Sequence, residues 1–366
     1  MIQILLQIEL SFSDYKFGIL AFVTAFVVAM IVMPPLIKLI NRFKLFDVPD
    51  NRKEHVTPIP TMGGIASCAG MVAGCILWFK FTRDIFTVSL FFSIAILFFI
   101  GVMDDLKNLS ARYKLAIQLA VALLIAFSGV RITSFNGLFG IYELPVSAQY
   151  SFTLLAIAGI TNAFNLIDGI DGLAGGLGFM SLVMLGLFLT FSGDINNAII
   201  AFALGGGLLG FLYYNFNPAR IFMGDTGSLV LGFVISVLSI RLIQLNTGQG
   251  TIIPHISIFA LSIVAIPVFD TLRVFTLRIW AGKSPFSPDK NHIHHLLTNN
   301  GWSHSFAAKL ICGVHAVVLA LGYFLKDLPQ IGGFLILLAV MLVTVFIFQR
   351  LMPPASSAVA AKEQPL

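Results

Sequence analysis

Long apolar runs dominate the chain, and short polar loops separate them. Windows of about 20 apolar residues, the length that crosses a bilayer as a helix, predict eleven helices. The predicted spans are residues 17–40, 61–80, 86–103, 115–134, 150–167, 173–191, 198–214, 227–245, 255–275, 306–325 and 331–350. This pattern predicts an all-α, polytopic integral membrane protein with about eleven transmembrane helices.

Composition agrees with this interpretation and excludes an ordinary soluble domain. Of the 366 residues, 58% are hydrophobic and only 11% are charged. We expect a single transmembrane domain over residues 1–351 and a disordered tail over residues 352–366, which are rich in alanine and proline. The net charge of +5 is scattered and forms no basic patch with interleaved aromatic residues, so we expect no nucleic-acid partner.

The positive charges predict the orientation of the helices. If the N-terminus lies outside, all but six of the 22 Lys and Arg residues fall on one face of the membrane. The six on the opposite face are Lys16, Lys80, Arg83, Arg131, Arg241 and Lys326. The positive-inside bias makes the first face cytoplasmic. We expect a multi-pass protein of the plasma (inner) membrane. The polar loops of unusual composition also fall on that face, which predicts a single site facing the cytoplasm.

Five aspartates stand at helix ends on the predicted cytoplasmic face. Asp104 and Asp105 end the third span, Asp168 and Asp171 end the fifth, and Asp225 opens the eighth. Uncompensated carboxylates in one place repel one another and lose hydration. A hard divalent cation is their natural partner, and Mg²⁺ prefers one or two carboxylates together with phosphate oxygens and water. The aspartates therefore predict a site for a metal ion and a phosphate group.

Basic residues and glycines near these aspartates fit the same chemistry. The basic residues are Lys53, Lys107, Arg112, Lys114, Arg220 and Lys290, each of which can also be read as an ordinary positive-inside anchor. Gly169 and Gly172 follow aspartates where a chain that leaves a helix can adopt positive φ and turn its N–H groups toward a ligand. Gly224 precedes Asp225 at a helix start, which favours an anion.

Histidines are clustered in the segment PDKNHIHHLLTNNGWSH, as His292, His294, His295 and His304. Zinc would need further ligands from elsewhere in the chain, because no cysteine accompanies the cluster. Imidazoles that donate hydrogen bonds to phosphate oxygens suit the aspartate-rich surroundings better.

Four motifs in order resemble those of the polyprenyl-phosphate N-acetylhexosamine-1-phosphate transferases. They are PTMGG at 60–64, GVMDD at 101–105, NAFNLIDGIDGLAGG at 162–176 with FMGDTGS at 222–228, and SPFSPDKNHIHH at 284–295. The resemblance runs from about residue 41 to residue 305. It implies transfer of a sugar 1-phosphate from a UDP-sugar to a membrane polyprenyl phosphate. The products are a lipid-linked pyrophosphate sugar and UMP, and Mg²⁺ or Mn²⁺ is required.

The resemblance also implies roles for individual residues. Asp225 would bind the metal ion, with Asp168 next to the metal or the diphosphate, and Asp104 or Asp105 would deprotonate the lipid phosphate or assist its attack. The residues that would contact the diphosphate are His292, His294 and His295. The residues that would bind the substrate are Lys53, Lys114, Asn165, Gly169, Ile170, Asp171, Asn215, Phe222 and Lys290. Among these, Gly169 to Asp171 resemble a uridine-binding loop, and Phe222 matches a ring that stacks on uracil.

The histidine motif indicates the branch of the family. Ile293 interrupts the run of histidines that is typical of the pentapeptide-transferring enzymes, so the chain looks like the N-acetylglucosamine-type branch. That branch supplies lipid-linked sugars for cell-surface polysaccharides and wall polymers. We expect UDP-N-acetylglucosamine as the donor and undecaprenyl phosphate as the acceptor. Another UDP-N-acetylhexosamine or phospho-N-acetylmuramoyl-pentapeptide is the alternative.

Several alternatives stay open from the sequence. Direct attack by the lipid phosphate and a covalent aspartyl-phosphate intermediate are both compatible with these residues. Small-residue faces serve internal packing or a homodimer equally well. An ion-coupled transporter would be expected to show related halves or broken helices, and a membrane scaffold would not need the Asp and His clusters. The alcohol phosphotransferases that use CDP-linked lipids carry a DG-x2-AR pattern, which this chain lacks.

Overall fold

The computed structural model describes residues 12–43, 46–47, 59–246, 255–285 and 291–351. Its long helices are α2 (Phe12–Phe43), α3 (Gly64–Trp78), α4 (Ile85–Lys107), α5 (Ala111–Phe127), α6 (Val146–Ile167), α7 (Leu173–Phe191), α8 (Ile195–Asn215), α9 (Gly224–Leu245), α10 (Ile256–Trp280), α12 (His304–Leu325) and α13 (Gln330–Arg350). The short elements are β1 (Phe46–Asp47), β2 (Ile59–Pro60), the 3-10 turn η1 (Leu138–Gly140) and α11 (Ile293–Asn299). The strands β1 and β2 pair antiparallel.

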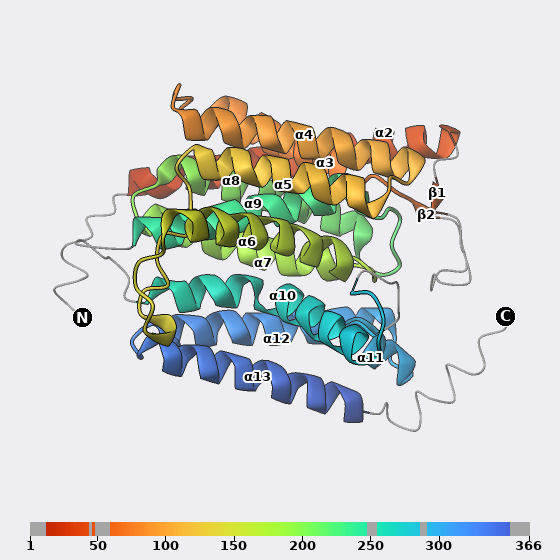
Figure 1. Ribbon diagram of the computed structural model, residues 1–366. Coiled ribbons are helices and arrows are strands. Elements are labelled where there is room, and N and C mark those ends of the chain that lie inside the picture. Colours follow the sequence, from red (N-terminus) through yellow and green to blue (C-terminus); the bar gives the residue numbers. More distant parts are fainter. Residues whose placement is uncertain (1–11, 44–45, 48–58, 247–254, 286–290, 352–366) are drawn as a thin grey trace.

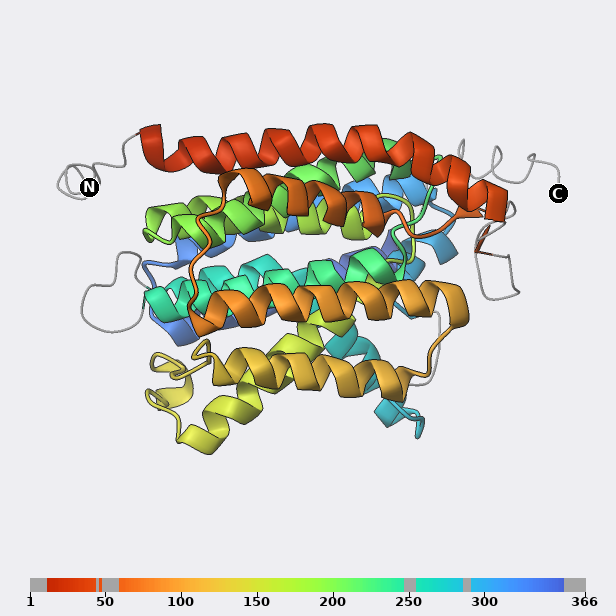
Figure 2. The same cartoon turned by 90° about the horizontal axis from the view of Figure 1, so that it is seen from above.

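The long helices of the described residues run side by side in one bundle, so their ends gather at two opposite ends of the molecule (Figures 1 and 2). Nine of them are long and apolar enough to cross a bilayer. The other two, α3 and α5, have 15 and 17 residues and are shorter than the roughly 20 that a full span needs. The chain is therefore an all-α polytopic membrane protein, and each of the eleven predicted spans corresponds to one long helix.

The helix boundaries lie within five residues of the prediction, except at the end of α5. The predicted span 115–134 is wrong at its end, because α5 stops at Phe127. There the Ser128 hydroxyl donates to the Ile125 carbonyl, and Gly129 adopts a φ of 102°, which ends the helix. In α10 the helix continues to Trp280, five residues beyond the predicted end at 275. The proposed division into one domain and a tail stays a prediction, since residues 352–366 lie outside the described residues.

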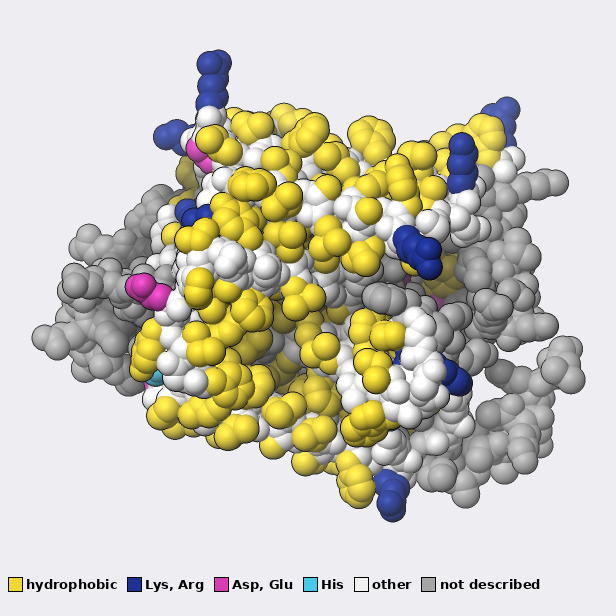
Figure 3. All heavy atoms as spheres, in the orientation of Figure 1, with side chains coloured by type: hydrophobic (Ala, Val, Ile, Leu, Met, Phe, Trp, Pro, Cys, Tyr) yellow, Lys and Arg dark blue, Asp and Glu magenta, His cyan; other side chains and the backbone are white. Residues whose placement is uncertain are grey.

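The core of the bundle lies among α7, α8 and α9, whose side chains are mostly buried. The outer helices, such as α2 and α13, instead expose much of their apolar surface. Hydrophobic side chains cover the middle of the molecule in the view of Figure 3. Because lipid tails are as apolar as these side chains, this surface suits a protein surrounded by a bilayer.

The loops lie at two opposite ends of the bundle, and polar contacts join loops within each end. At one end of the bundle, which we call the far end, Arg241 donates to Asp194 at 2.9 Å and Asn196 donates to the Lys80 carbonyl at 2.9 Å. At the opposite end, where α4, α6, α8 and α10 finish, the aspartates of the sequence motifs come together. We call this second end the site end.

Glycines allow the central helices to approach closely. A Cβ on Gly206 of α8 would lie 2.1 Å from the Phe22 carbonyl oxygen, and one on Gly207 would lie 2.4 Å from the Ser67 carbonyl oxygen. These two glycines therefore serve the packing of one helix against another. Small residues at such crossings are typical of membrane helices, which associate through close van der Waals contact.

Gly64 provides a test of this packing at the start of α3. A Cβ at Gly64 would lie 2.2 Å from the Gly227 Cα of α9, so Gly64→Ala must push the two helices apart. We expect Gly64→Ala to lower the thermal unfolding temperature in detergent, because overpacking costs about 1–3 kcal/mol. Gly159→Ala is the matched control, since nothing lies within 4 Å of a Cβ there. Equal unfolding temperatures for the two variants would refute the close contact.

Candidate active site

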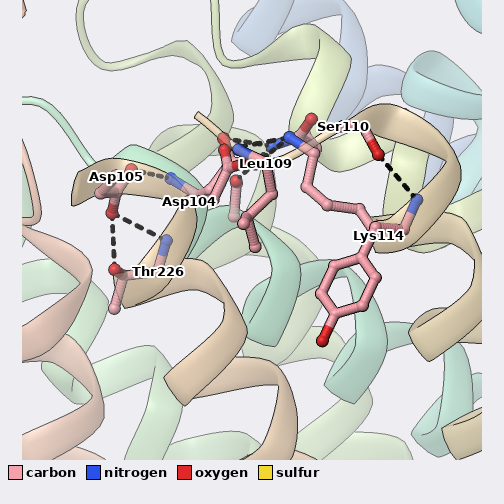
Figure 4. Close-up of polar contacts among 10 residues, drawn as sticks. Asp104, Asp105, Leu109, Ser110, Lys114 and Thr226 are labelled. Carbon is pink, nitrogen blue, oxygen red and sulfur yellow. Dashed lines mark hydrogen bonds and ion pairs between the residues drawn. The ribbon is translucent and has the colours of Figure 1, made fainter. Parts of the chain in front are cut away.

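A lysine that bridges two aspartates forms the centre of the site end. The Lys114 Nζ at the start of α5 lies 3.0 Å from Asp104 Oδ2 of α4 and 2.6 Å from Asp225 Oδ2 of α9 (Figure 4). The other oxygen of Asp104 accepts a hydrogen bond of 2.7 Å from the Leu109 backbone N–H. These three charged side chains are only partly accessible to solvent. The helices α4, α5 and α9 are therefore joined through one ammonium group.

Asp105 holds the N-terminus of α9. Its carboxylate accepts hydrogen bonds from the Asp225 N–H at 2.8 Å and from the Thr226 N–H and hydroxyl at 3.1 and 2.5 Å (Figure 4). A negative charge there satisfies orphan N–H groups and interacts favourably with the helix dipole. Gly224 has a φ of 72°, and a Cβ on it would lie 2.6 Å from Asp105 Oδ2. The glycine therefore permits this close approach.

Helix α6 reaches the same cluster through an asparagine. The Asn165 side-chain N–H₂ donates to Asp225 Oδ1 and to the Ser228 hydroxyl, both at 2.9 Å. One turn earlier, the Asn162 amide donates to Gln118 Oε1 of α5 at 2.5 Å. Both oxygens of Asp225 are thus engaged, one by Lys114 and one by Asn165. The structure therefore places Asn165 and Lys114 in direct contact with Asp225.

Asp168 follows the last residue of α6 and faces the other carboxylates. Burial raises the pKa of this carboxyl to about 7, and the negative charges of Asp225, Asp105 and Asp171 add to the rise. An added positive charge stabilises a carboxylate that lies near other carboxylates. The donor set suits Mg²⁺ for this reason, since Mg²⁺ uses one or two carboxylates and completes its shell with water and phosphate.

The described residues contain no ready-made cage of three or more His, Cys, Asp or Glu side chains for a metal ion. The assignment of Asp225 and Asp168 as metal ligands stays a prediction.

Hydrogen bonds of the Asn215 and Asp171 side chains fix the loop after Asp168. The Gly172 N–H donates to Asn215 Oδ1 at 2.9 Å, and the Asn215 amide donates to the Ile221 carbonyl at 2.8 Å. Asp171 Oδ2 accepts from the Asn217 amide and the Ala219 N–H, both at 3.1 Å. Gly172 has the predicted positive φ, of 77°, whereas the same prediction for Gly169 is wrong, because its φ is not positive. Asn215 and Asp171 therefore join the aspartate loop to the segment between α8 and α9.

Two further members of the predicted uridine loop differ in exposure. Ile170 is buried, whereas Gly169 is exposed at the surface of the loop. A Cβ on Gly169 would lie 2.5 Å from His294 Nε2. The histidine segment thus reaches the aspartate loop, although some 120 residues separate them in the sequence. This approach brings residues of the third and fourth motifs into one site.

Phe222 lies in a segment that the PTMGG motif supports. Its N–H donates to the Pro60 carbonyl at 2.8 Å, and its carbonyl accepts from the Gly63 N–H at 2.8 Å. The Gly64 N–H donates to the Met223 carbonyl at 2.9 Å. These backbone bonds explain why the two motifs occur together. The stacking of the Phe222 ring on uracil stays a prediction.

The histidines lie at the start of α11, close to one another. His292 and His294 are buried, and their rings are parallel with centroids 5.9 Å apart. The His295 ring is 4.2 Å from that of His294 and is partly buried. The structure therefore brings all three predicted histidines together. Lys53 and Lys290, which the sequence also assigned to substrate binding, lie outside the described residues.

Sequence reasoning missed Asp270 in α10. This side chain is only 1% exposed, and its Oδ2 lies 2.8 Å from His292 Nδ1. A buried carboxylate in an apolar helix is a functional signal by default, and Arg273 three residues later is its ion-pair partner at 2.9 Å. That signal was present in the sequence, but the predicted span 255–275 enclosed both residues.

The chain is similar in sequence to proteins of one known family. Residues 87–243 match the model for glycosyl transferase family 4. A relative from Bacillus subtilis (strain 168), a probable undecaprenyl-phosphate N-acetylglucosaminyl 1-phosphate transferase, is 38% identical over 80% of both chains. The chain belongs to glycosyl transferase family 4.

Two enterobacterial members of the family show a similar relationship. The undecaprenyl-phosphate alpha-N-acetylglucosaminyl 1-phosphate transferase of Escherichia coli (strain K12) is 35% identical over 78% of this chain and 77% of its own length. The protein of the same name from Yersinia pestis is 33% identical over 78% of each chain. The family resemblance seen in the sequence motifs is thereby confirmed, and the chain is a sugar-phosphate transferase.

The capping role of Asp105 leads to a prediction. We expect Asp105→Ala to lower stability by about 1–2 kcal/mol, because three hydrogen bonds to the start of α9 are lost. Transferase activity should fall as well, since Asp225 lies in the same turn. Asp84→Ala is the control. Asp84 accepts a hydrogen bond of 2.9 Å from the Thr87 N–H at the far-end start of α4.

Thermal unfolding and UMP release from the two purified variants test this prediction. Asp84→Ala should lose similar stability but keep the activity of the unmodified chain. Unchanged stability of Asp105→Ala would contradict the capping role.

Proposed function

We propose that this protein transfers N-acetylglucosamine 1-phosphate from UDP-N-acetylglucosamine to undecaprenyl phosphate and releases UMP. Membership of glycosyl transferase family 4 and the names of its relatives support this reaction. The product would be the first lipid-linked intermediate of a cell-surface polysaccharide or wall polymer. The observation that carries the proposal is the Asp104–Lys114–Asp225 cluster beside Asp168 at one end of a membrane bundle.

The position of the cluster suits two substrates of different solubility. A polyprenyl phosphate has its chain in the bilayer and its phosphate at the interface, whereas a UDP-sugar arrives from water. The site end provides charged groups where the apolar helices finish, so both phosphates can meet there without crossing the bilayer core. We propose that the site end faces the cytoplasm in the plasma (inner) membrane, as the bias of Lys and Arg predicts.

The proposed cofactor is Mg²⁺, with Mn²⁺ as the alternative, and Asp225 and Asp168 would hold it. When bound, the ion would supply positive charge against the donor diphosphate. Lys114 adds a second cation next to Asp225. Two negatively charged phosphate groups must approach each other in this reaction, so such neutralisation is the main requirement of the site.

The contacts of the paired aspartates support different roles for them. Asp105 uses both oxygens to hold α9, so we assign it to positioning. Asp104 shares Lys114 with Asp225, so we propose that Asp104 and Lys114 receive the acceptor phosphate. The loop from Gly169 to Asp171 and the ring of Phe222 would bind uridine, and the histidines of α11 would contact the diphosphate. A homodimer stays a prediction.

The donor can be tested by incubating the purified protein with undecaprenyl phosphate and Mg²⁺. We expect UMP and a labelled lipid from UDP-N-acetylglucosamine and at least tenfold less from other UDP-N-acetylhexosamines. UDP-N-acetylmuramoyl-pentapeptide should give no labelled lipid, because Ile293 breaks the run of histidines typical of that branch. If UDP-N-acetylglucosamine gives neither product, the proposed donor is wrong.

The metal assignment can be tested with Asp225→Asn. This change keeps the size of the side chain but removes the charge that faces Lys114 and, in our proposal, the metal ion. We expect kcat to fall by about 100-fold or more, as for the loss of a principal electrostatic group in an active site. Removal of divalent ions with EDTA should stop UMP release from the unmodified chain, and added Mg²⁺ should restore it.

Asn165→Asp serves as a contrasting variant at the same carboxylate. It replaces the amide that donates to Asp225 by a second carboxylate, which repels Asp225 and should lower activity. Because Mg²⁺ compensates the added negative charge, activity should recover in part as the Mg²⁺ concentration rises. Asp225→Asn should show no such recovery. Retention of most activity by Asp225→Asn, with an unchanged requirement for Mg²⁺, would overturn the assignment.

A further inference from the structure

The buried carboxylate of Asp270 has three hydrogen-bond partners, and all of them lead to the histidine segment. Its Oδ2 lies 2.8 Å from His292 Nδ1. Its Oδ1 accepts from the Ile293 N–H and from Arg273 Nη2, both at 2.9 Å. The same Arg273 nitrogen donates to the Asn291 carbonyl. One carboxylate and one guanidinium of α10 therefore bind three consecutive residues at the start of α11.

The contact with Asp270 determines how the His292 ring presents its nitrogens. An ionised carboxylate only accepts hydrogen bonds, so His292 Nδ1 must carry the proton and donate it. The Nε2 atom then stands on the opposite side of the ring, as an acceptor in the neutral imidazole and as a donor in the imidazolium. In acid–histidine pairs of catalytic triads, the carboxylate fixes the tautomer and the direction of the ring in the same way.

His292 is in contact with the rest of the histidine segment in α11. Its ring is parallel to that of His294, with an interplanar angle of 4°, and His294 packs against Gly169 in the aspartate loop. Helix α11 has seven residues and no side-chain cap from its own N-cap residue. The Ile293 N–H instead finds its acceptor on Asp270. The start of α11 therefore depends on α10 for its position.

We propose that Asp270 is a positioning residue for the sugar-phosphate transfer, and that it acts by holding His292 in one tautomer and orientation, with Arg273 as its partner. Oriented in this way, His292 directs Nε2 toward the donor diphosphate. This inference rests on the proposed function for its effect on turnover. The attachment of the histidine segment to α10 does not depend on the proposed function.

The kinetic test uses Asp270→Asn. The amide is nearly equal in size, but it offers an N–H₂ group where the carboxylate accepted from His292 and Arg273. We expect kcat for UMP release to fall at least tenfold while KM for UDP-N-acetylglucosamine changes less than threefold. A histidine that acts on charge developing in the transition state affects kcat more than ground-state binding. The matched control is Asp194→Asn, which removes the carboxylate paired with Arg241 at the far end and should keep both constants.

A double-mutant cycle separates positioning from a general structural role. If Asp270 acts through His292, then adding Asp270→Asn to His292→Ala should cost less than threefold further in kcat. A further loss as large as that of Asp270→Asn alone would overturn the proposal. So would a kcat of Asp270→Asn equal to that of the unmodified chain.

Hydrogen exchange provides a readout that does not depend on activity. In Asp270→Ala the Ile293 N–H loses its acceptor, so the amides of residues 291–299 should exchange at least tenfold faster, while Asp194→Asn leaves them unchanged. Unchanged exchange in Asp270→Ala would overturn the attachment. If the unmodified chain released no UMP from any UDP-sugar, the proposed function would fail, but faster exchange would still support the attachment of the segment to α10.

Discussion

The salt bridge from Lys114 to Asp104 and Asp225 is the interaction on which the site end depends. These charges come from three helices and are only partly exposed, so each carboxylate relies on the shared ammonium for compensation. Without it, two carboxylates would face each other at the edge of an apolar bundle. The bridge therefore joins α4, α5 and α9 through one ammonium group.

The membrane explains why this cluster stands at helix ends. Charges near the bilayer centre cost roughly 2.5–3.5 kcal/mol each on insertion scales, and polar groups at the interface avoid most of that cost. Close packing then brings the ends together. A Cβ on Gly101 would lie 2.4 Å from the Thr226 Cα, and Gly64 meets Gly227 in the same region. The small residues of α3, α4 and α9 thus allow the backbones to approach until Asp105 can reach the start of α9.

Much of this arrangement was predictable from the sequence, because its signals are strong and local. Apolar runs separated by polar loops define the eleven helices, and carboxylates next to glycines mark the loops of the site. What the sequence did not predict depends on contacts between distant segments. Asp104 or Asp105 was expected to act on the lipid phosphate, but the three hydrogen bonds by which Asp105 holds the start of α9 were not predicted. Asp270 was overlooked because it sits inside an apolar span, and only the fold shows its contact with His292.

The two aspartates of the loop after α6 now have distinct physical surroundings. Asp168 faces the other carboxylates, which together with burial raises its pKa to about 7, so it favours a cation. Asp171 accepts hydrogen bonds from Asn217 and Ala219 with one oxygen, while its second oxygen is buried without a hydrogen-bond partner in the described part of the chain. A buried acceptor of this kind suits a neutral donor such as an N–H group better than a metal ion shared with Asp225. One short loop can therefore serve two unlike parts of a nucleotide-sugar, because its two carboxylates point into different environments.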